Sequence, residues 1–241
     1  MSDFLRHYSK QEYMTPGAAR TVEMIAETAQ PGEATWLLDV ASGKGEAAAS
    51  LAARFACNAV AVELYDPFIH YSAAKFWHYN LRDLVTLVRA NGRRLPVRDG
   101  VFDAAYCIGA PSIVGLEPCL REMARAVRPS GHVIVSDIVW RTKPEAPLGP
   151  EWLWVSSFQQ ISADEYAAAI ESAGLTVETT VIHPASDWDE YWQPMLKVAN
   201  EAKLSQPADI DFADGVESGV AVERRAVDAW LDYATFIARK P

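Results

Sequence analysis

The stretch Leu38-Asp39-Val40-Ala41-Ser42-Gly43-Lys44-Gly45-Glu46 decides the fold. A short apolar run ends in it, a turn with two glycines follows, and an alanine-rich segment continues beyond it. We interpret the stretch as a buried strand over 36–40, a tight turn and a helix. Glycines let the backbone approach a ligand closely, and free N–H groups at a helix start favour a negative group on it. The turn alone is weak evidence, because dinucleotide-binding enzymes also have it.

Two acidic residues narrow the choice of ligand. Asp39 stands at the strand end, where a dinucleotide would place its pyrophosphate, and a carboxylate repels phosphate. It suits a ligand with an ammonium and a sulfonium group, such as the methionine part of S-adenosylmethionine (SAM). Ala48 replaces the third glycine of the dinucleotide pattern, and only Lys44 favours phosphate. Glu63 ends the next expected strand, where an acid can bind ribose hydroxyls in SAM and NAD enzymes alike. The alternative is that both acids cap nearby loops.

Strands and helices alternate outward from this stretch, which predicts a doubly wound parallel sheet with its ligand beyond the carboxyl ends of the strands. Thr15 and Pro16 fit the N-cap and first position of a helix that ends near Glu27. We expect further helices over 66–79 and 116–127, and strands over 58–63, 85–90, 102–108 and 132–138.

The pattern changes after Trp140. A capping box, Ser162 to Glu165, opens a helix that ends near Gly174, and a strand is expected over 175–182. A helical hairpin follows, with arms over 187–202 and 216–230 and an acidic loop over 209–214, before a last strand over 233–239. The aromatic residues of the first arm recur at helical spacing, which favours a role in the core of the hairpin.

The bulk properties exclude several classes of protein. The formal net charge of −10 and a pI near 5.0 disfavour nucleic acid as a partner. The three cysteines have no spacing typical of a disulfide framework or a zinc site, so we expect no metal. The first residues contain no apolar run of signal-peptide length, and no later segment is long enough to span a bilayer. We therefore expect a cytoplasmic protein, a monomer or homodimer, without membrane contact.

At this point a family resemblance is visible. The segments 38–45, 60–63, 95–97, 102–103 and 120–131 together resemble the ordered motifs of class I SAM-dependent methyltransferases, over residues 13 to 139. A closer resemblance, to small bacterial methyltransferases with a helical hairpin before the last strand, rests on 108–112, Trp140, 187–191 and the tail. It implies an α/β fold: a Rossmann-like, doubly wound, mostly parallel seven-stranded sheet with an antiparallel last strand and a small helical cap.

The resemblance also implies a division of one domain, residues 1–241. An N-terminal helix or lid would occupy 1–30, the SAM-binding core 31–139, and a C-terminal part with the helical insertion at about 187–230 would occupy 140–241.

Carried over residue by residue, the resemblance assigns the cofactor site. Gly43, Gly45 and Asp39 would bind the methionine part, together with Ala41, and Glu63 the ribose. The adenine would lie near Leu64, Asn91 and Gly92, although ordinary core packing is an equal alternative for Leu64. Ile108, at the end of a strand, would lie near the reacting methyl group. Ala41 stands where the family usually has Gly, so we expect a negative φ there and a slightly altered turn.

The sequence says less about the site of the methyl acceptor. Asp137 and Cys107, both near strand ends, are the candidate catalytic residues, and Tyr13 and Trp140 are the candidates for the substrate pocket. We expect methyl transfer from SAM to a small molecule by in-line displacement. An NAD(P)-linked oxidoreductase and a SAM-binding module without catalysis are the alternatives.

Overall fold

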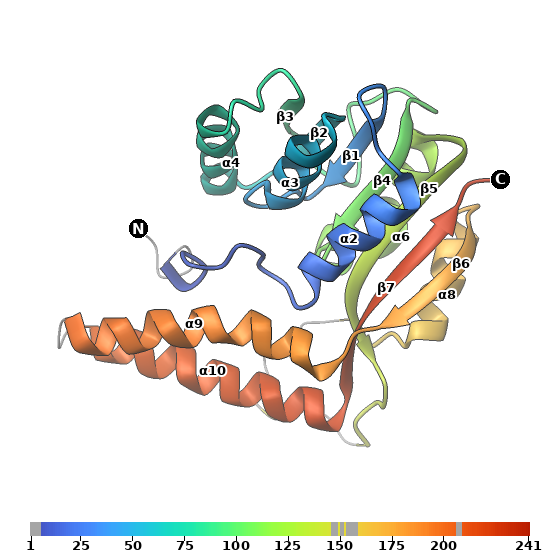
Figure 1. The fold of residues 1–241 in the computed structure, drawn as a ribbon. Helices are drawn as coiled ribbons and strands as arrows, with labels where there is room; N and C mark the ends of the chain where they lie inside the picture. Colours follow the sequence, from blue (N-terminus) through green and yellow to red (C-terminus); the bar gives the residue numbers. More distant parts are fainter. Residues whose placement is uncertain (1–5, 146–148, 150–151, 153–158, 206–208) are drawn as a thin grey trace.

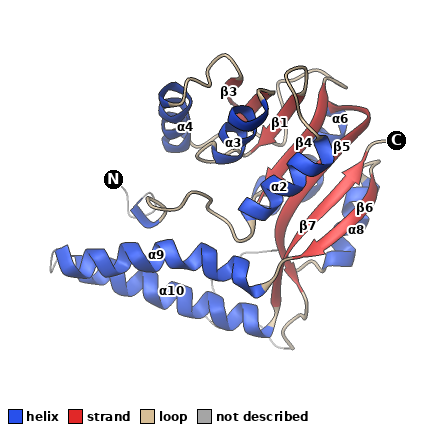
Figure 2. Cartoon of the chain, viewed as in Figure 1, coloured by secondary structure: helices blue, strands red, loops and turns tan. Residues whose placement is uncertain are grey.

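Seven strands form one sheet in the computed structural model, which describes residues 6–145, 149, 152, 159–205 and 209–241. Their order across the sheet is β3-β2-β1-β4-β5-β7-β6 (Figures 1 and 2). The strands are β1 (Trp36–Val40), β2 (Asn58–Glu63), β3 (Val85–Arg89), β4 (Phe102–Ile108), β5 (Val127–Trp140), β6 (Thr176–Ile182) and β7 (Leu231–Arg239).

The pairing of the strands defines where a ligand can bind. β1 pairs in parallel with both β2 and β4, and β7 pairs antiparallel with β5 and β6. The chain order reverses between β1 and β4, so the crevice at their carboxyl ends is the switch point where open α/β sheets bind ligands. The predicted doubly wound sheet with an antiparallel last strand is therefore confirmed.

Helices cover both faces of the sheet (Figure 2). One apolar cluster joins the sheet to the helices over 18–29, 46–55 and 66–78, and another joins it to the helices over 116–126 and 163–172. The helices with defined bounds are α2 (Ala18–Ala29), α3 (Glu46–Phe55), α4 (Asp66–His78), α5 (Pro111–Val114), α6 (Leu116–Ala126), α8 (Ala163–Ser172), α9 (Ala185–Ser205) and α10 (Ile210–Ala229). Within the described ranges no helix is long and apolar enough to cross a membrane.

The hairpin of α9 and α10 forms a third apolar cluster beyond the carboxyl ends of β5 and β6 (Figure 1). Its core contains Trp188, Tyr191, Trp192 and Met195, as their helical spacing predicts. The N-terminal segment runs beside α9 before it enters α2. The hairpin and the N-terminal segment are thus the two parts that can cover the switch point.

Three local expectations are wrong. Helix α2 begins at Ala18 and not at Pro16, because Gly17 takes the N-cap position with a left-handed φ of 62°. The segment 209–214 is not a loop, since α10 begins at Ile210, and the acid Asp211 in its first turn suits the helix dipole. Strand β5 starts at Val127, five residues earlier than expected, because its pairing with β4 continues across a register shift.

Candidate active site

The glycine turn between β1 and α3 is held by the neighbouring strand. Ser42 N donates to Val62 O at 3.0 Å, and Gly43 N donates to Glu63 Oε2 at 2.8 Å. Gly43 has a φ of 55°, and a Cβ on it would lie 2.7 Å from Met14 Cε. A side chain at Gly43 would therefore fill the space between the turn and the N-terminal segment.

Ala41 corrects one sequence prediction. Its φ is 57°, in the left-handed region, where we expected a negative value. An L-residue in this conformation costs roughly 1–2 kcal/mol. The neighbouring hydrogen bonds of the turn oppose that cost, so the backbone keeps a conformation that normally favours glycine.

Asp39 is a buried acid with an unsatisfied oxygen. Its side chain is 3% exposed and lines a cavity beside the glycine turn. Oδ2 has no hydrogen-bond partner among the residues that the structure describes. Burial, together with the nearby charge of Glu63, raises the pKa of Asp39 to about 8. A buried acceptor without a donor destabilises a fold by ~1–3 kcal/mol, so Oδ2 is an atom of this cavity that a donor on a ligand could satisfy.

Glu63 is also buried, but three backbone N–H groups bind its carboxylate. These come from Gly43 at 2.8 Å to Oε2, and from Leu64 at 2.7 Å and Tyr65 at 2.8 Å to Oε1. A carboxylate has about four acceptor sites. Glu63 therefore does cap the loop, as the alternative proposed, and retains room for a further donor.

Lys44 is not available for a phosphate. Its Nζ donates to the backbone carbonyls of Tyr8, at 3.2 Å, and of Gln11. Burial is the main reason that its pKa is lowered to about 8, with Lys75 contributing. The one residue in the turn that favoured a dinucleotide thus fixes the N-terminal segment instead.

A second cavity, of about 320 Å³, lies at the carboxyl ends of β2 and β3. Ala41 lines both this cavity and the one at Asp39. Leu64 is 54% exposed and Ile113 72%, which excludes core packing for Leu64. Asn91 Oδ1 accepts the N–H of Arg93 at 2.9 Å. The lining includes the predicted residues Glu63, Leu64, Asn91 and Gly92.

Residues 11–17, which we call the strap, cross the end of β4 next to Ile108. Thr15 packs on Gly109 so closely that a Cβ there would lie 2.0 Å from Thr15 Cγ2. Tyr13 lines the cavity at Asp39, and burial, with the neighbouring charge of Glu12, raises its pKa to about 12. The Tyr13 hydroxyl therefore stays protonated at neutral pH.

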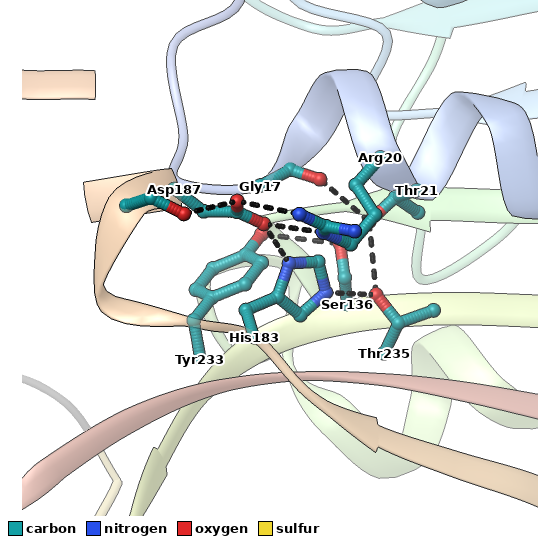
Figure 3. A network of polar contacts seen from close by, with 9 residues as sticks. Gly17, Arg20, Thr21, Ser136, His183, Asp187, Tyr233 and Thr235 are labelled. Atoms are coloured by element: carbon teal, nitrogen blue, oxygen red, sulfur yellow. Dashed lines mark hydrogen bonds and ion pairs between the residues drawn. The ribbon is translucent and has the colours of Figure 1, made fainter. Parts of the chain in front are cut away.

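A polar network holds the strap and α2 to the hairpin (Figure 3). Arg20 Nε donates to Asp187 Oδ2 at 2.8 Å, and His183 Nδ1 lies 2.8 Å from the same oxygen. His183 Nε2 is 2.7 Å from Thr235 Oγ1, which in turn lies 2.9 Å from Thr21 Oγ1. Burial lowers the pKa of His183. The network therefore fixes the position of the strap from β7 and α9.

The structure does not bring the two candidate catalytic residues to either cavity. Asp137 is 2% exposed, and its carboxylate accepts from Ser112 N at 2.9 Å, Ile138 N at 2.8 Å and Tyr166 Oη at 3.3 Å. Cys107 is fully buried in the cluster with α6, because alternate residues of a strand face opposite sides of the sheet. Burial raises the pKa of both groups.

The other predicted site residues also divide into those that line a cavity and those that are buried elsewhere. Trp140 is 1% exposed and packs in the hairpin cluster, away from the two cavities. Gly45 caps α3 and packs against Phe76. Asp39, Ala41, Gly43, Ile108 and Tyr13 come together in one cavity. Among the residues described, no group of His, Cys, Asp and Glu side chains could hold a metal ion.

Sequence reasoning missed most of the strap. Glu12, Met14 and Thr15 line the cavity at Asp39, and Gln11 binds Lys44. The available signal was Thr15-Pro16-Gly17, but the spacing of these residues also fits a helix start. Contacts with residues as distant as Gly109 decide between the two structures.

Comparisons with known proteins agree with this geometry. A family described as a methyltransferase domain matches residues 38–135. The O-methyltransferase cnsE of Penicillium expansum is 22% identical over 171 residues, which are 70% of this chain and 62% of that relative. The alignment therefore covers less than two thirds of the relative's length.

Solved structures share the fold over almost the whole chain. A SAM-dependent methyltransferase of Geobacter sulfurreducens, in complex with S-adenosylhomocysteine, has a TM-score of 0.81 at 18% identity and covers 99% of this chain and 98% of its own. The cyclase SpnF has a TM-score of 0.74 at 19% identity and covers 93% and 81%. With the family match at the glycine turn, these findings agree with the resemblance: residues 38–135 match a methyltransferase domain, and the chain has the fold of a SAM-dependent methyltransferase.

Proposed function

We propose that this chain transfers the methyl group of SAM to a small-molecule acceptor by in-line displacement. The observation that carries the proposal is the Oδ2 atom of Asp39, buried beside the glycine turn without a partner among the described residues. Lys44, the cation in the lining of this cavity, is bound to backbone carbonyls. A ligand with an ammonium group would supply both the donor and the charge that Asp39 lacks.

The second cavity fits the nucleoside part of the same ligand. Glu63 would use its remaining acceptor site for a ribose hydroxyl, or exchange one backbone N–H for it. Leu64 and Ile113 present exposed apolar surface to an adenine ring, and burying each side chain contributes about 1.5–3 kcal/mol. Asn91 has one acceptor lone pair left for the adenine amine, since Arg93 N–H uses the other.

Catalysis would then depend mainly on positioning. Bound SAM supplies a methyl carbon activated by its sulfonium. Ile108 lines the cavity at the end of β4, and Thr15 packs on the adjacent Gly109. These residues would shape the site and exclude water from it. Correct alignment of two reactants contributes ~7–11 kcal/mol in favourable cases. No strong base is required for this contribution, which agrees with the structural environments of Asp137 and Cys107.

Calorimetry tests the choice of ligand. SAM should bind with a Kd of order micromolar, or about −8 kcal/mol, and NAD at least tenfold more weakly. Tighter binding of NAD would contradict the proposal and favour an oxidoreductase.

A second experiment must detect transfer itself, because the fold is shared with a cyclase. Labelled-methyl SAM should be incubated with thiols, amines, phenols and carboxylates, and both labelled product and S-adenosylhomocysteine measured. We expect equal amounts of both with at least one acceptor class. Binding of SAM without transfer to any class would indicate a module that holds SAM and does not use it.

A further inference from the structure

A third cavity adjoins the first across the strap. Its volume is about 320 Å³, and its walls are the strap and the first turns of α9. Glu12, Tyr13, Thr15 and Ala18 line both this cavity and the one at Asp39. A molecule in the third cavity would therefore contact the same wall residues as the methionine part of the proposed cofactor. The inference below rests on the proposed methyl transfer.

One wall of this cavity contains an unsatisfied acceptor. Gln11 is 3% exposed, and its Nε2 donates to the carbonyl of Tyr191 at 2.8 Å, which fixes the orientation of the amide. The Oε1 atom of the same amide is buried and has no partner in the described part of the chain. As at Asp39, a ligand with a hydrogen-bond donor would satisfy it.

The charges around the cavity leave an excess of negative charge. Asp187 is paired with Arg20 at 2.8 Å, and Lys10 is paired with Glu201. Glu12 and Glu190 also line the cavity, and no ion pair of either is found among the described residues. After the paired charges cancel, these two carboxylates remain.

Aromatic surface completes the lining. Tyr13 and Tyr191 both contribute to it. An aromatic face attracts an organic cation, and more strongly where the cation is desolvated. From the acceptor atoms, the two carboxylates and the rings we infer that the third cavity binds the methyl acceptor and selects a compound with an ammonium group.

The test uses tetramethylammonium as the probe and tert-butanol as its neutral counterpart of similar shape. Calorimetry would be run on the full chain, both free and saturated with S-adenosylhomocysteine. Tetramethylammonium should bind at least tenfold more tightly than tert-butanol. The variant Glu190→Gln, at a residue that lines the third cavity and not the one at Asp39, should lose most of this preference and keep its affinity for S-adenosylhomocysteine within twofold.

The matched control is Glu171→Gln, which removes one exposed acidic charge outside the cavity lining. It should bind tetramethylammonium like the unmodified chain. Equal affinity for the two probes, or an equal loss in Glu190→Gln and Glu171→Gln, would overturn the inference. Failure of S-adenosylhomocysteine to bind would overturn the proposed function instead, and the measurement on the free chain would still decide the inference.

Discussion

Two buried aspartates near the carboxyl ends of parallel strands have opposite surroundings. Asp39, on β1, has an oxygen without a partner in the described residues and lines a cavity. Asp137, on β5, accepts hydrogen bonds from Ser112, Ile138 and Tyr166. Burial raises the pKa of both. The difference supports the proposal that the carboxyl end of β1 binds the ligand, whereas Asp137 on β5 joins this strand to two helices.

The largest effect on stability should come from Asp137, which joins β5 to two helices. Asp137→Ala leaves two backbone N–H groups and a tyrosine hydroxyl without their acceptor. Each buried unsatisfied group costs ~1–3 kcal/mol, so the free energy of unfolding should fall by about 3–5 kcal/mol. Chemical denaturation would measure this loss.

Asp137→Asn is the control for a catalytic role. It keeps the shape and one side-chain oxygen, so the loss of stability should be smaller and methyl transfer should persist in the folded protein. A stable Asp137→Asn protein that binds SAM but has lost transfer would contradict the comparison, because it would make Asp137 a general base.

The next largest effect, on SAM binding, should come from Asp39 on β1. Asp39→Asn should weaken SAM binding by about 1.5–3 kcal/mol, because it removes a charge-assisted hydrogen bond. The free energy of unfolding should not fall, since Asn keeps the shape of the side chain and Oδ2 has no partner among the described residues. Calorimetry and denaturation of the same variant measure the two quantities. Unchanged SAM affinity would contradict the role of Asp39.

The pH dependence of stability and of SAM binding also tests the comparison between Asp39 and Asp137. Folding raises the pKa of Asp39 from 3.8 to about 8, so the folded chain holds a proton that the unfolded chain has lost. Stability should therefore fall as pH rises between these values. An ammonium ligand needs the ionised carboxylate, so SAM binding at pH 6.5 should release about one proton.

Calorimetry in buffers of different ionisation enthalpy would count that proton. The Asp39→Asn variant should release none. Proton release of the same size in this variant would assign the titration to another group.

The sequence predicted the sheet and the position of the glycine turn well, and the reason is physical. Asp39, Glu63 and the glycine turn lie at fixed positions relative to strand ends, and a parallel sheet brings those ends to one edge. The helical spacing of Trp188 and Trp192 likewise located the hairpin core. In these cases local pattern and tertiary position depend on the same residues.

The acceptor half could not be predicted in the same way. Whether Lys44 faces a phosphate or a carbonyl depends on residues 8–11, and Thr15 is positioned by Gly109. Asp137 and Asp39 look alike in sequence, because the donors to Asp137 include Tyr166 on a distant helix. Ala41 takes a positive φ because neighbouring segments hold the turn. Such long-range contacts leave no local pattern.

The smallest effect should come from Cys107, the other residue considered for catalysis. Its thiol faces the cluster with α6 and not the cavities, so Cys107→Ala removes packing only. The free energy of unfolding should fall by about 1 kcal/mol, the range for deleting one buried atom group, and turnover should stay within twofold. Cys119→Ala is the matched control, because Cys119 is equally buried in the same cluster on α6. The Cys107 variant could instead lose turnover tenfold while its stability and SAM affinity equal those of the control. That result would mean that side chains on both faces of β4 take part in the reaction. The separation between ligand-binding and structural residues would then not hold at this strand.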